Sequence, residues 1–178
     1  MNFSVTKNGK PLDLDLYTWD EYNRIFKTRE SDLVLDFTDI SDVDFETGDS
    51  CIFKTMSHCT FRTGSYCTFE TGNNCSFKTR SYCTFKTRSE CSFETNNFCV
   101  FSTSNNCSFR TGMKCTFHTD FNCVFETGKS CVFSAGFSCV FEVDDNCVLV
   151  RSDVFEVIKL KKNRKIKLNE IHKKNTHS

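Results

Sequence analysis

From Leu35 onward, apolar and polar residues alternate in short runs that repeat every eight residues. A typical unit reads Cys-Thr-Phe-Lys-Thr, followed by three residues drawn mainly from Gly, Asn, Ser and Asp. Cys, Phe and Thr occupy alternate positions and therefore share one face of a β-strand. The three residues that follow are typical of turns. Each octad thus predicts one five-residue strand and one corner.

The Cys, Phe and Thr positions are predicted to point into the molecule, because the Thr position becomes Ala135 and then Val143 near the C-terminal end. The two positions between them carry Ser, Thr or Val and then mostly charged residues, which suits a solvent-facing surface. A fixed short period indicates a repeat architecture. The predicted inner ladders consist of Cys51, Cys59, Cys67, Cys75, Cys83, Cys91, Cys99, Cys107, Cys115, Cys123, Cys131, Cys139 and Cys147, and of Phe53, Phe61, Phe69, Phe77, Phe85, Phe93, Phe101, Phe109, Phe117, Phe125, Phe133 and Phe141.

Two signals favour a coil of 16 residues over a triangular coil of 24. Tyr66, Tyr82 and Phe98 recur at a spacing of 16. Like charges stacked on neighbouring strands are unfavourable, and at this spacing Lys54, Glu70 and Lys86 alternate in sign, although the other row places Arg62 beside Lys78. The sequence therefore predicts an all-β fold, a flattened parallel β-solenoid (β-helix) with two octads per 16-residue coil and about seven coils.

Both ends of such a solenoid need covers, since an open coil exposes backbone pairing groups and the Phe core. Residues 1–34 are predicted to form an N-terminal cap with a short helix near 18–28, because Thr18 to Glu21 reads as a capping box and Trp19, Tyr22, Ile25 and Phe26 fall on one helical stripe. Residues 35–150 form the solenoid. Residues 151–178 are predicted to form a basic β-hairpin cap and a flexible tail.

Net charge is zero but unevenly distributed along the 178 residues. The balance is −7 over residues 1–50, +1 over residues 51–150 and +6 over residues 151–178. An elongated protein would display this asymmetry as two charged ends, so weak head-to-tail self-association is an expectation. No apolar run is long enough for a membrane span, and the N-terminus lacks the apolar segment of a signal peptide.

Thirteen cysteines invite three chemical interpretations besides simple packing. Disulfides fit poorly, because the count is odd and stacked neighbours hold their Cβ vectors parallel. Zinc sites use tighter Cys and His groupings, although a thiol row could hold a soft ion such as Cu(I). Thirteen equivalent thiols do not single out a nucleophile. Cys as a small buried residue beside Phe is the favoured interpretation, and it suits a reducing compartment, cytoplasmic or virion-associated.

The remaining residues offer no catalytic, metal or cofactor site. His58, His118, His172 and His177 are scattered, and no phosphate loop or paired-carboxylate arrangement is visible. The outward hydroxyl row resembles flat ice-binding solenoids, but charged neighbours and several Val residues interrupt it, so ice binding is a minor hypothesis. The C-terminal basic cluster could contact nucleic acid or an anionic surface, but it lacks interleaved aromatics, which favours a solvated hairpin face with a basic tail. Its residues are the candidate contacts for a partner: Lys159, Lys161, Lys162, Arg164, Lys165 and Lys167.

The units CTFKTRSE and CSFKTRSY, the entry TWDEYNRIFK and the exit NCVLVRSDVFEVIKL resemble an octapeptide-repeat family. Members occur among hypothetical proteins of phages, prophages and related viral sequences and are loosely described as pentapeptide-repeat-like. The resemblance implies a solenoid and brings no catalytic residue or ligand with it. It leads to the hypothesis of a phage- or virus-associated, non-enzymatic scaffold. The alternative is a rod-like inhibitor or mimic that binds a host nucleic-acid enzyme.

Overall fold

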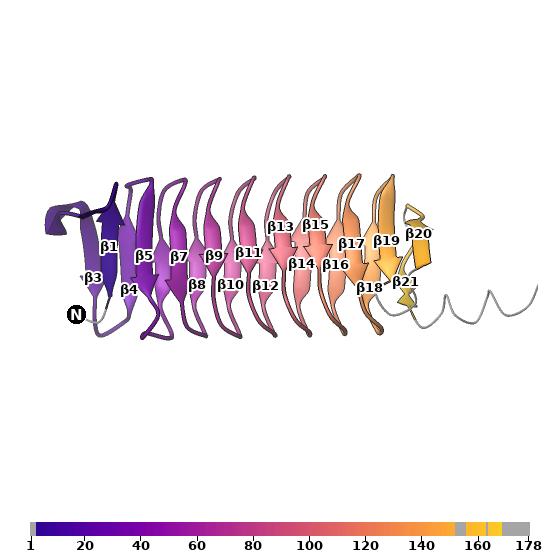
Figure 1. The fold of residues 1–178 in the computed structure, drawn as a ribbon, viewed down its shortest axis with the longest axis horizontal. Coiled ribbons are helices and arrows are strands. Elements are labelled where there is room, and N and C mark those ends of the chain that lie inside the picture. The colour runs from indigo at the N-terminus through magenta and orange to yellow at the C-terminus, as the bar shows by residue number, and fades with distance from the viewer. Residues whose placement is uncertain (1–2, 152–155, 163, 169–178) are drawn as a thin grey trace, which may run out of the picture.

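The computed structural model describes residues 3–151, 156–162 and 164–168. These residues form a parallel β-solenoid whose strands lie across a long axis, with the N-terminal cap at one end and the last two strands at the other (Figure 1). Within this part of the chain, sheet A has 11 strands and sheet B has 10. The all-β solenoid predicted from the octads is confirmed.

Sheet A begins with the antiparallel cap strands and continues with one strand from each coil. In spatial order its strands are β2 (Lys10–Pro11), β1 (Ser4–Lys7), β5 (Leu33–Phe37), β7 (Ile52–Thr55), β9 (Thr68–Glu70), β11 (Thr84–Lys86), β13 (Val100–Ser102), β15 (Thr116–His118), β17 (Val132–Ala135), β19 (Cys147–Arg151) and β20 (Glu156–Leu160).

Sheet B supplies the other strand of each coil. From its N-terminal edge its strands are β3 (Tyr17–Asp20), β4 (Ile25–Thr28), β6 (Asp44–Glu46), β8 (Thr60–Arg62), β10 (Ser76–Lys78), β12 (Ser92–Glu94), β14 (Ser108–Thr111), β16 (Val124–Thr127), β18 (Val140–Val143) and β21 (Ile166–Lys167).

Neighbouring strands of the regular region pair in parallel between residues 16 apart, as Phe77 does with Phe93 in sheet B and Phe85 with Phe101 in sheet A. The parallel series runs from β4 to β18 in sheet B and from β5 to β19 in sheet A, which gives about eight coils rather than seven. The extra coil arises because β4 and β5, assigned to the cap from the sequence, already pair in parallel with β6 and β7.

The core consists of the inward Cys, Phe and Thr positions. Phe rings stack along each sheet, with centroids 4.9 Å apart for Phe69 and Phe85, and meet the opposite sheet edge to face, with 5.2 Å between Phe69 and Phe77. Burying each ring contributes about 2 kcal/mol before entropy is counted. The inward Thr side chains are buried as well, as Thr63 and Thr71 show.

Each corner ends in a residue with a left-handed backbone. These φ values lie near +60° and include bulky residues such as Tyr66 (61°), Glu90 (62°) and Phe98 (59°). Backbone hydrogen bonds join successive corners, as from Tyr66 N to Ser81 O at 3.1 Å. Side chains add to the ladder, since Asn97 Oδ1 accepts from Met113 N at 2.9 Å. The corners are therefore built by backbone geometry and need no glycine.

The predicted helix at 18–28 is wrong. This segment is an antiparallel hairpin of β3 and β4, in which Trp19 pairs with Phe26. The carboxylate of Asp20 forms the turn by accepting hydrogen bonds from Tyr22 N at 3.1 Å and Asn23 N at 2.9 Å. These bonds satisfy the turn locally, and Tyr22 is 95% exposed instead of joining an apolar stripe.

The predicted C-terminal hairpin also differs from the structure. β20 pairs antiparallel with β19 in sheet A, whereas β21 pairs antiparallel with β18 in sheet B. The two segments therefore cover the last strand of each sheet instead of pairing with each other. Leu160 and Leu168 are buried at this end of the core. The predicted tail from residue 169 lies outside the described residues.

Candidate interaction surfaces

The cysteine thiols lie in the core of the solenoid. All 13 cysteines are free and buried. Their sulfurs face the corners, as Cys75 shows by donating to Asn73 O at 3.4 Å and to Met56 O at 3.7 Å. The same pair of carbonyl contacts recurs from coil to coil, for example at Cys91 with Ser89 O at 3.4 Å and Gly72 O at 3.7 Å. The thiols thus make the same contacts with corner carbonyl groups in successive coils.

The two ends of the thiol column in sheet A show how this setting affects chemistry. A hydrogen bond with Cys67, together with burial, raises the pKa of the Cys51 thiol far above its ordinary value. A hydrogen bond with Cys131 and burial raise the pKa of Cys147 in the same way. Because the thiolate is the reactive form, these two thiols are poor nucleophiles and poor metal ligands. Other core thiols shift the opposite way, since a hydrogen bond with Cys75 lowers the pKa of Cys59 to about 7.

Side chains that could bind a metal ion are dispersed over the described structure. Within the part of the chain that the structure describes, no three His, Cys, Asp or Glu side chains gather as a metal site. His58 lies 3.9 Å from the Asp42 carboxylate on the exposed surface, and His118 lies in the outward row of sheet A. His172 and His177 lie outside the described residues. No helix in these residues is long and apolar enough to cross a membrane.

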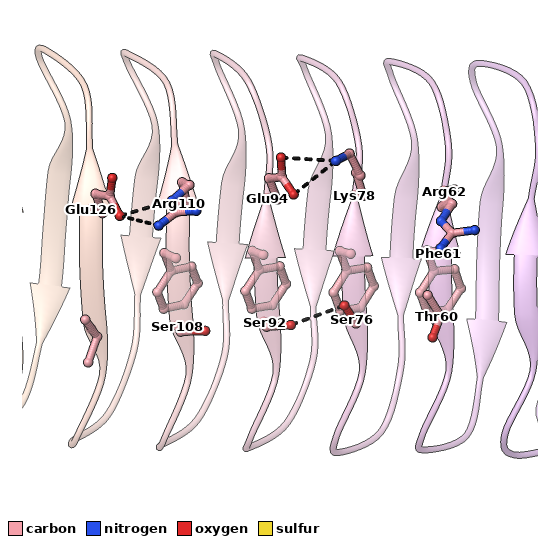
Figure 2. A pocket seen from close by; sticks show the side chains of 14 residues that line it. Thr60, Phe61, Arg62, Ser76, Lys78, Ser92, Glu94, Ser108, Arg110 and Glu126 are labelled. Carbon is pink, nitrogen blue, oxygen red and sulfur yellow. Dashed lines mark hydrogen bonds and ion pairs between the residues drawn. The ribbon is translucent and has the colours of Figure 1, made fainter.

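The outer face of sheet B is hollowed into a shallow groove of about 520 Å³ that runs across its strands. Figure 2 shows small hydroxyl side chains along one side of this groove, from Thr60 to Ser108, and charged side chains along the other, from Arg62 to Glu126. Because the Phe side chains point inward, the strand backbone at these residues forms the floor of the groove. The groove is open and follows directly from strand alternation.

Ion pairs join some of the charged side chains on this face. Lys78 Nζ lies 3.2 Å from Glu94, and Arg110 lies 3.0 Å from Glu126. Arg62 and Glu142 occupy the two ends of this stretch and make no ion pair within the described residues. Exposed pairs of this kind contribute little to stability, so their arrangement bears more on recognition than on folding.

Hydroxyl residues also occupy the outward row of sheet A, where Thr84 pairs with Val100 and Thr116 with Val132. Val100 and Val132 are 41% and 44% exposed. Neither outer face therefore carries an unbroken hydroxyl row beside a second small row.

An exposed aromatic ladder follows the corners that lead from sheet B to sheet A. The rings of Tyr66 and Tyr82 stack with centroids 5.0 Å apart, and those of Tyr82 and Phe98 with centroids 4.8 Å apart. Lys114 Nζ lies 5.3 Å from the centre of the Phe98 ring. The rings are 61%, 47% and 38% exposed from Tyr66 to Phe98. We call these four residues the aromatic edge.

Beside the aromatic edge runs a second open groove of about 720 Å³. Its lining combines cations, among them Arg29, Arg62 and Arg80, with the acidic residues Glu46 and Asp49. Exposed rings next to mixed charges are typical of protein-binding surfaces.

The predicted C-terminal contact residues fall into two groups, one residue that forms ion pairs within the chain and the rest. Lys162 lies 2.9 Å from Asp144 and 3.5 Å from Asp145, and the hydrogen bond with Asp144 raises the pKa of Lys162. This residue holds the end cap against the last corner. The remaining members of the cluster are exposed: Lys159, Lys161, Arg164, Lys165 and Lys167.

In the sequence, the spacing of Tyr66, Tyr82 and Phe98 served only to predict the coil length. Their regular spacing also indicated a ladder, because residues 16 apart at a corner must stack. What the sequence did not show is that the rings point outward.

Comparison of this chain with protein-family models, with curated proteins and with solved structures found no match. The resemblance to an octapeptide-repeat family therefore stays a prediction.

Proposed function

We propose that this chain is a non-enzymatic scaffold that binds a protein partner through its outer surface. The observation that carries the proposal is the aromatic edge. A folding requirement does not account for it, since the core is already filled by the inner Phe columns. Exposed aromatic residues gathered on one edge are common at binding surfaces.

Backbone conformation strengthens this argument. Tyr66, Tyr82 and Phe98 hold φ values of 61°, 61° and 59°, in the left-handed region where bulky side chains are uncommon. At several other corners the equivalent position is occupied by Asn, as at Asn74, Asn106 and Asn122, a residue type that tolerates this conformation better. His58, Glu90 and Lys114 occupy it elsewhere. Aromatic residues placed against the local preference support a role outside folding.

The aromatic edge suits a protein surface better than a nucleic-acid base. Adjacent rings cover each other's faces, with interplanar angles of 4° and 2°, so the ladder offers ring edges and the Tyr hydroxyl groups. Bases bind on open ring faces. The neighbouring groove also mixes both signs of charge, whereas a DNA mimic needs continuous negative charge. We therefore favour the scaffold over the inhibitor of a nucleic-acid enzyme.

The biological setting of the proposal rests on sequence alone. A phage- or virus-associated role follows from the family resemblance, and a reducing environment, cytoplasmic or virion-associated, suits thirteen unpaired thiols.

The test replaces the aromatic edge without harming the corners. In the triple variant Tyr66→Asn, Tyr82→Asn and Phe98→Asn, every new residue fits the left-handed backbone, so the fold should be retained. The matched control changes Glu90, which has the same conformation at the opposite corner, to Asn. Affinity purification with quantitative mass spectrometry, performed on all three proteins, should recover a partner with the native chain and the control but not with the triple variant.

Two results would overturn the proposal. One is a partner that all three proteins retain equally, which would place binding elsewhere. The other is turnover of a substrate by the purified native chain.

A further inference from the structure

The charged row on the outer face of sheet B has an unusual order. On six successive strands, from β8 to β18, it reads positive, positive, negative, positive, negative, negative. Read backwards with every sign inverted, the order is unchanged. These six residues are Arg62, Lys78, Glu94, Arg110, Glu126 and Glu142, and Glu46 on β6 and Lys27 on β4 precede them in the same row.

This order leaves two unfavourable steps within one chain. Arg62 lies beside Lys78 and Glu126 beside Glu142 on neighbouring strands, where like charges repel. The inner pairs compensate, since Lys78 binds Glu94 and Arg110 binds Glu126. Arg62 lies beside Glu46 on β6, but that carboxylate pairs with Lys27. Arg62 and Glu142 thus make no ion pair among the described residues, and they have opposite charges.

We propose that the outer face of sheet B binds the same face of a second copy of this chain, with the two solenoids antiparallel. The two-fold axis would lie between β12 and β14 and run along the strands. Each charge then meets its opposite on the second copy: Arg62 meets Glu142, Lys78 meets Glu126, and Glu94 meets Arg110. Every contact occurs twice, as in any isologous interface.

The second row on this face allows close approach. It carries small side chains, and the same axis places Thr60 opposite Val140 and Ser92 opposite Ser108. The shallow groove between the two rows crosses the strands from β8 to β16, which belong to the proposed contact (Figure 2).

The outer face of sheet A lacks this arrangement. Its charged row alternates strictly from Asp36 through Lys54 and Glu70 to Lys86, so neighbouring charges within the chain are already opposite. From Ser102 onward the row holds no Lys, Arg, Asp or Glu up to Ser134. Only sheet B combines two like-charged steps with an order that a second copy neutralises.

The size of the face sets the expected strength. Six strands about 4.8 Å apart and three or four residues long cover on the order of 330 Å² per copy, or roughly 650 Å² in total. Stable interfaces bury more, so the dimer should be weak, and its exposed charges should make it sensitive to salt.

The test uses Arg62→Glu and Glu142→Arg. Each variant places like charges at both symmetric contacts, so the dissociation constant should rise by about tenfold or more. An equimolar mixture of the two should restore dimers, because Glu at position 62 meets Arg at position 142 in the mixed pair and the native residues meet in the other contact. The chain carrying both changes should also dimerise. Sedimentation velocity at low and high salt measures all five samples.

Two controls separate association from folding. Glu142→Arg removes the repulsion with Glu126 inside one chain, so its melting temperature should not fall. Arg88→Glu makes the same charge change as Arg62→Glu at an exposed corner away from sheet B, and it should dimerise like the native chain.

A native chain that is monomeric at every concentration and salt would overturn the proposal. So would single variants that dimerise normally, or a mixture that stays monomeric. Association lost only when Lys161 and Arg164 become Glu would instead assign the contact to the ends of the rod, and would also overturn it.

Discussion

The two faces of each strand in this solenoid follow different rules. Inward positions repeat Cys, Phe and Thr with little change, and successive rings such as Phe85 and Phe101 stack with only 2° between their planes. Outward positions on the same strands vary from Lys78 to Glu94 within one step. The inner face therefore specifies the fold, because each inward side chain packs against the side chains of two neighbouring strands. The outer face is free to carry charge patterns and aromatic residues that serve recognition.

The largest expected effect concerns the inner face, where the thiols should react far more slowly in the folded protein than in the unfolded one. All 13 are buried, so a thiol reagent should modify few of them in the native protein and nearly all in denaturant. The raised pKa values of Cys51 and Cys147 slow the reaction of these two thiols further, since only the thiolate attacks. Titration with a chromogenic reagent measures the count. Rapid native modification of most thiols would contradict the inward assignment of this column.

A charge on the inner face should be far more harmful than one on the outer face. Phe85→Asp places an unpaired carboxylate among stacked rings, and even the milder Phe85→Ala should cost about 3–5 kcal/mol. Lys86→Asp, on the next residue but facing outward, should change the melting temperature little. Thermal unfolding followed by circular dichroism compares the three variants. Equal melting temperatures for Phe85→Asp and Lys86→Asp would show that the in and out assignment is wrong.

The sequence predicted the inner face well because strand alternation converts directly into side-chain direction. Residues 51–147 needed only the octad and the stacking of Tyr66, Tyr82 and Phe98 to give the pairing that the structure has. The caps lack a repeat, and there the prediction was wrong. Trp19 and Phe26 fit a helical stripe as well as a hairpin, and the turn at Asp20 decided between them through side-chain hydrogen bonds. The C-terminal strands β20 and β21 pair with the last strand of each sheet. No local pattern in the sequence indicates this pairing.

The outer charges were visible in the sequence, where Arg62 beside Lys78 counted only as an imperfection of the 16-residue coil. Together with Glu126 beside Glu142, the same feature is the basis of the two-fold contact that we propose. A single chain gives no reason for such a symmetry, so it becomes informative only once the strand register is known.

The N-terminal cap should show an intermediate effect. Phe3 stacks on Phe37 at 4.3 Å and meets Trp19 at 5.2 Å, closing the end of the ring columns. Phe3→Ala should therefore destabilise the protein by about 2 kcal/mol and expose the first coil, which promotes association of sheet ends. Thermal unfolding with light scattering measures both effects. The matched control is Tyr22→Ala in the same cap, since Tyr22 is 95% exposed; an equal loss from both would mean that the cap does not cover the core.

The smallest expected effect concerns the corners, where neither the inner nor the outer rule applies. Glu90 holds a φ of 62°, a conformation that costs residues with a Cβ about 1 kcal/mol and costs Gly nothing. Glu90→Gly removes this strain but also loosens the unfolded chain, so the net change should be a small gain, at most about 1 kcal/mol. Thr84→Gly, on an exposed strand position, has no strain to relieve and should lose about 0.5–1 kcal/mol. Denaturant unfolding of both variants gives the sign of each change. A loss at Glu90 as large as that at Thr84 would mean that corner side chains contribute stabilising contacts, and that the corners, like the inner face, are specified by side-chain packing instead of by the backbone.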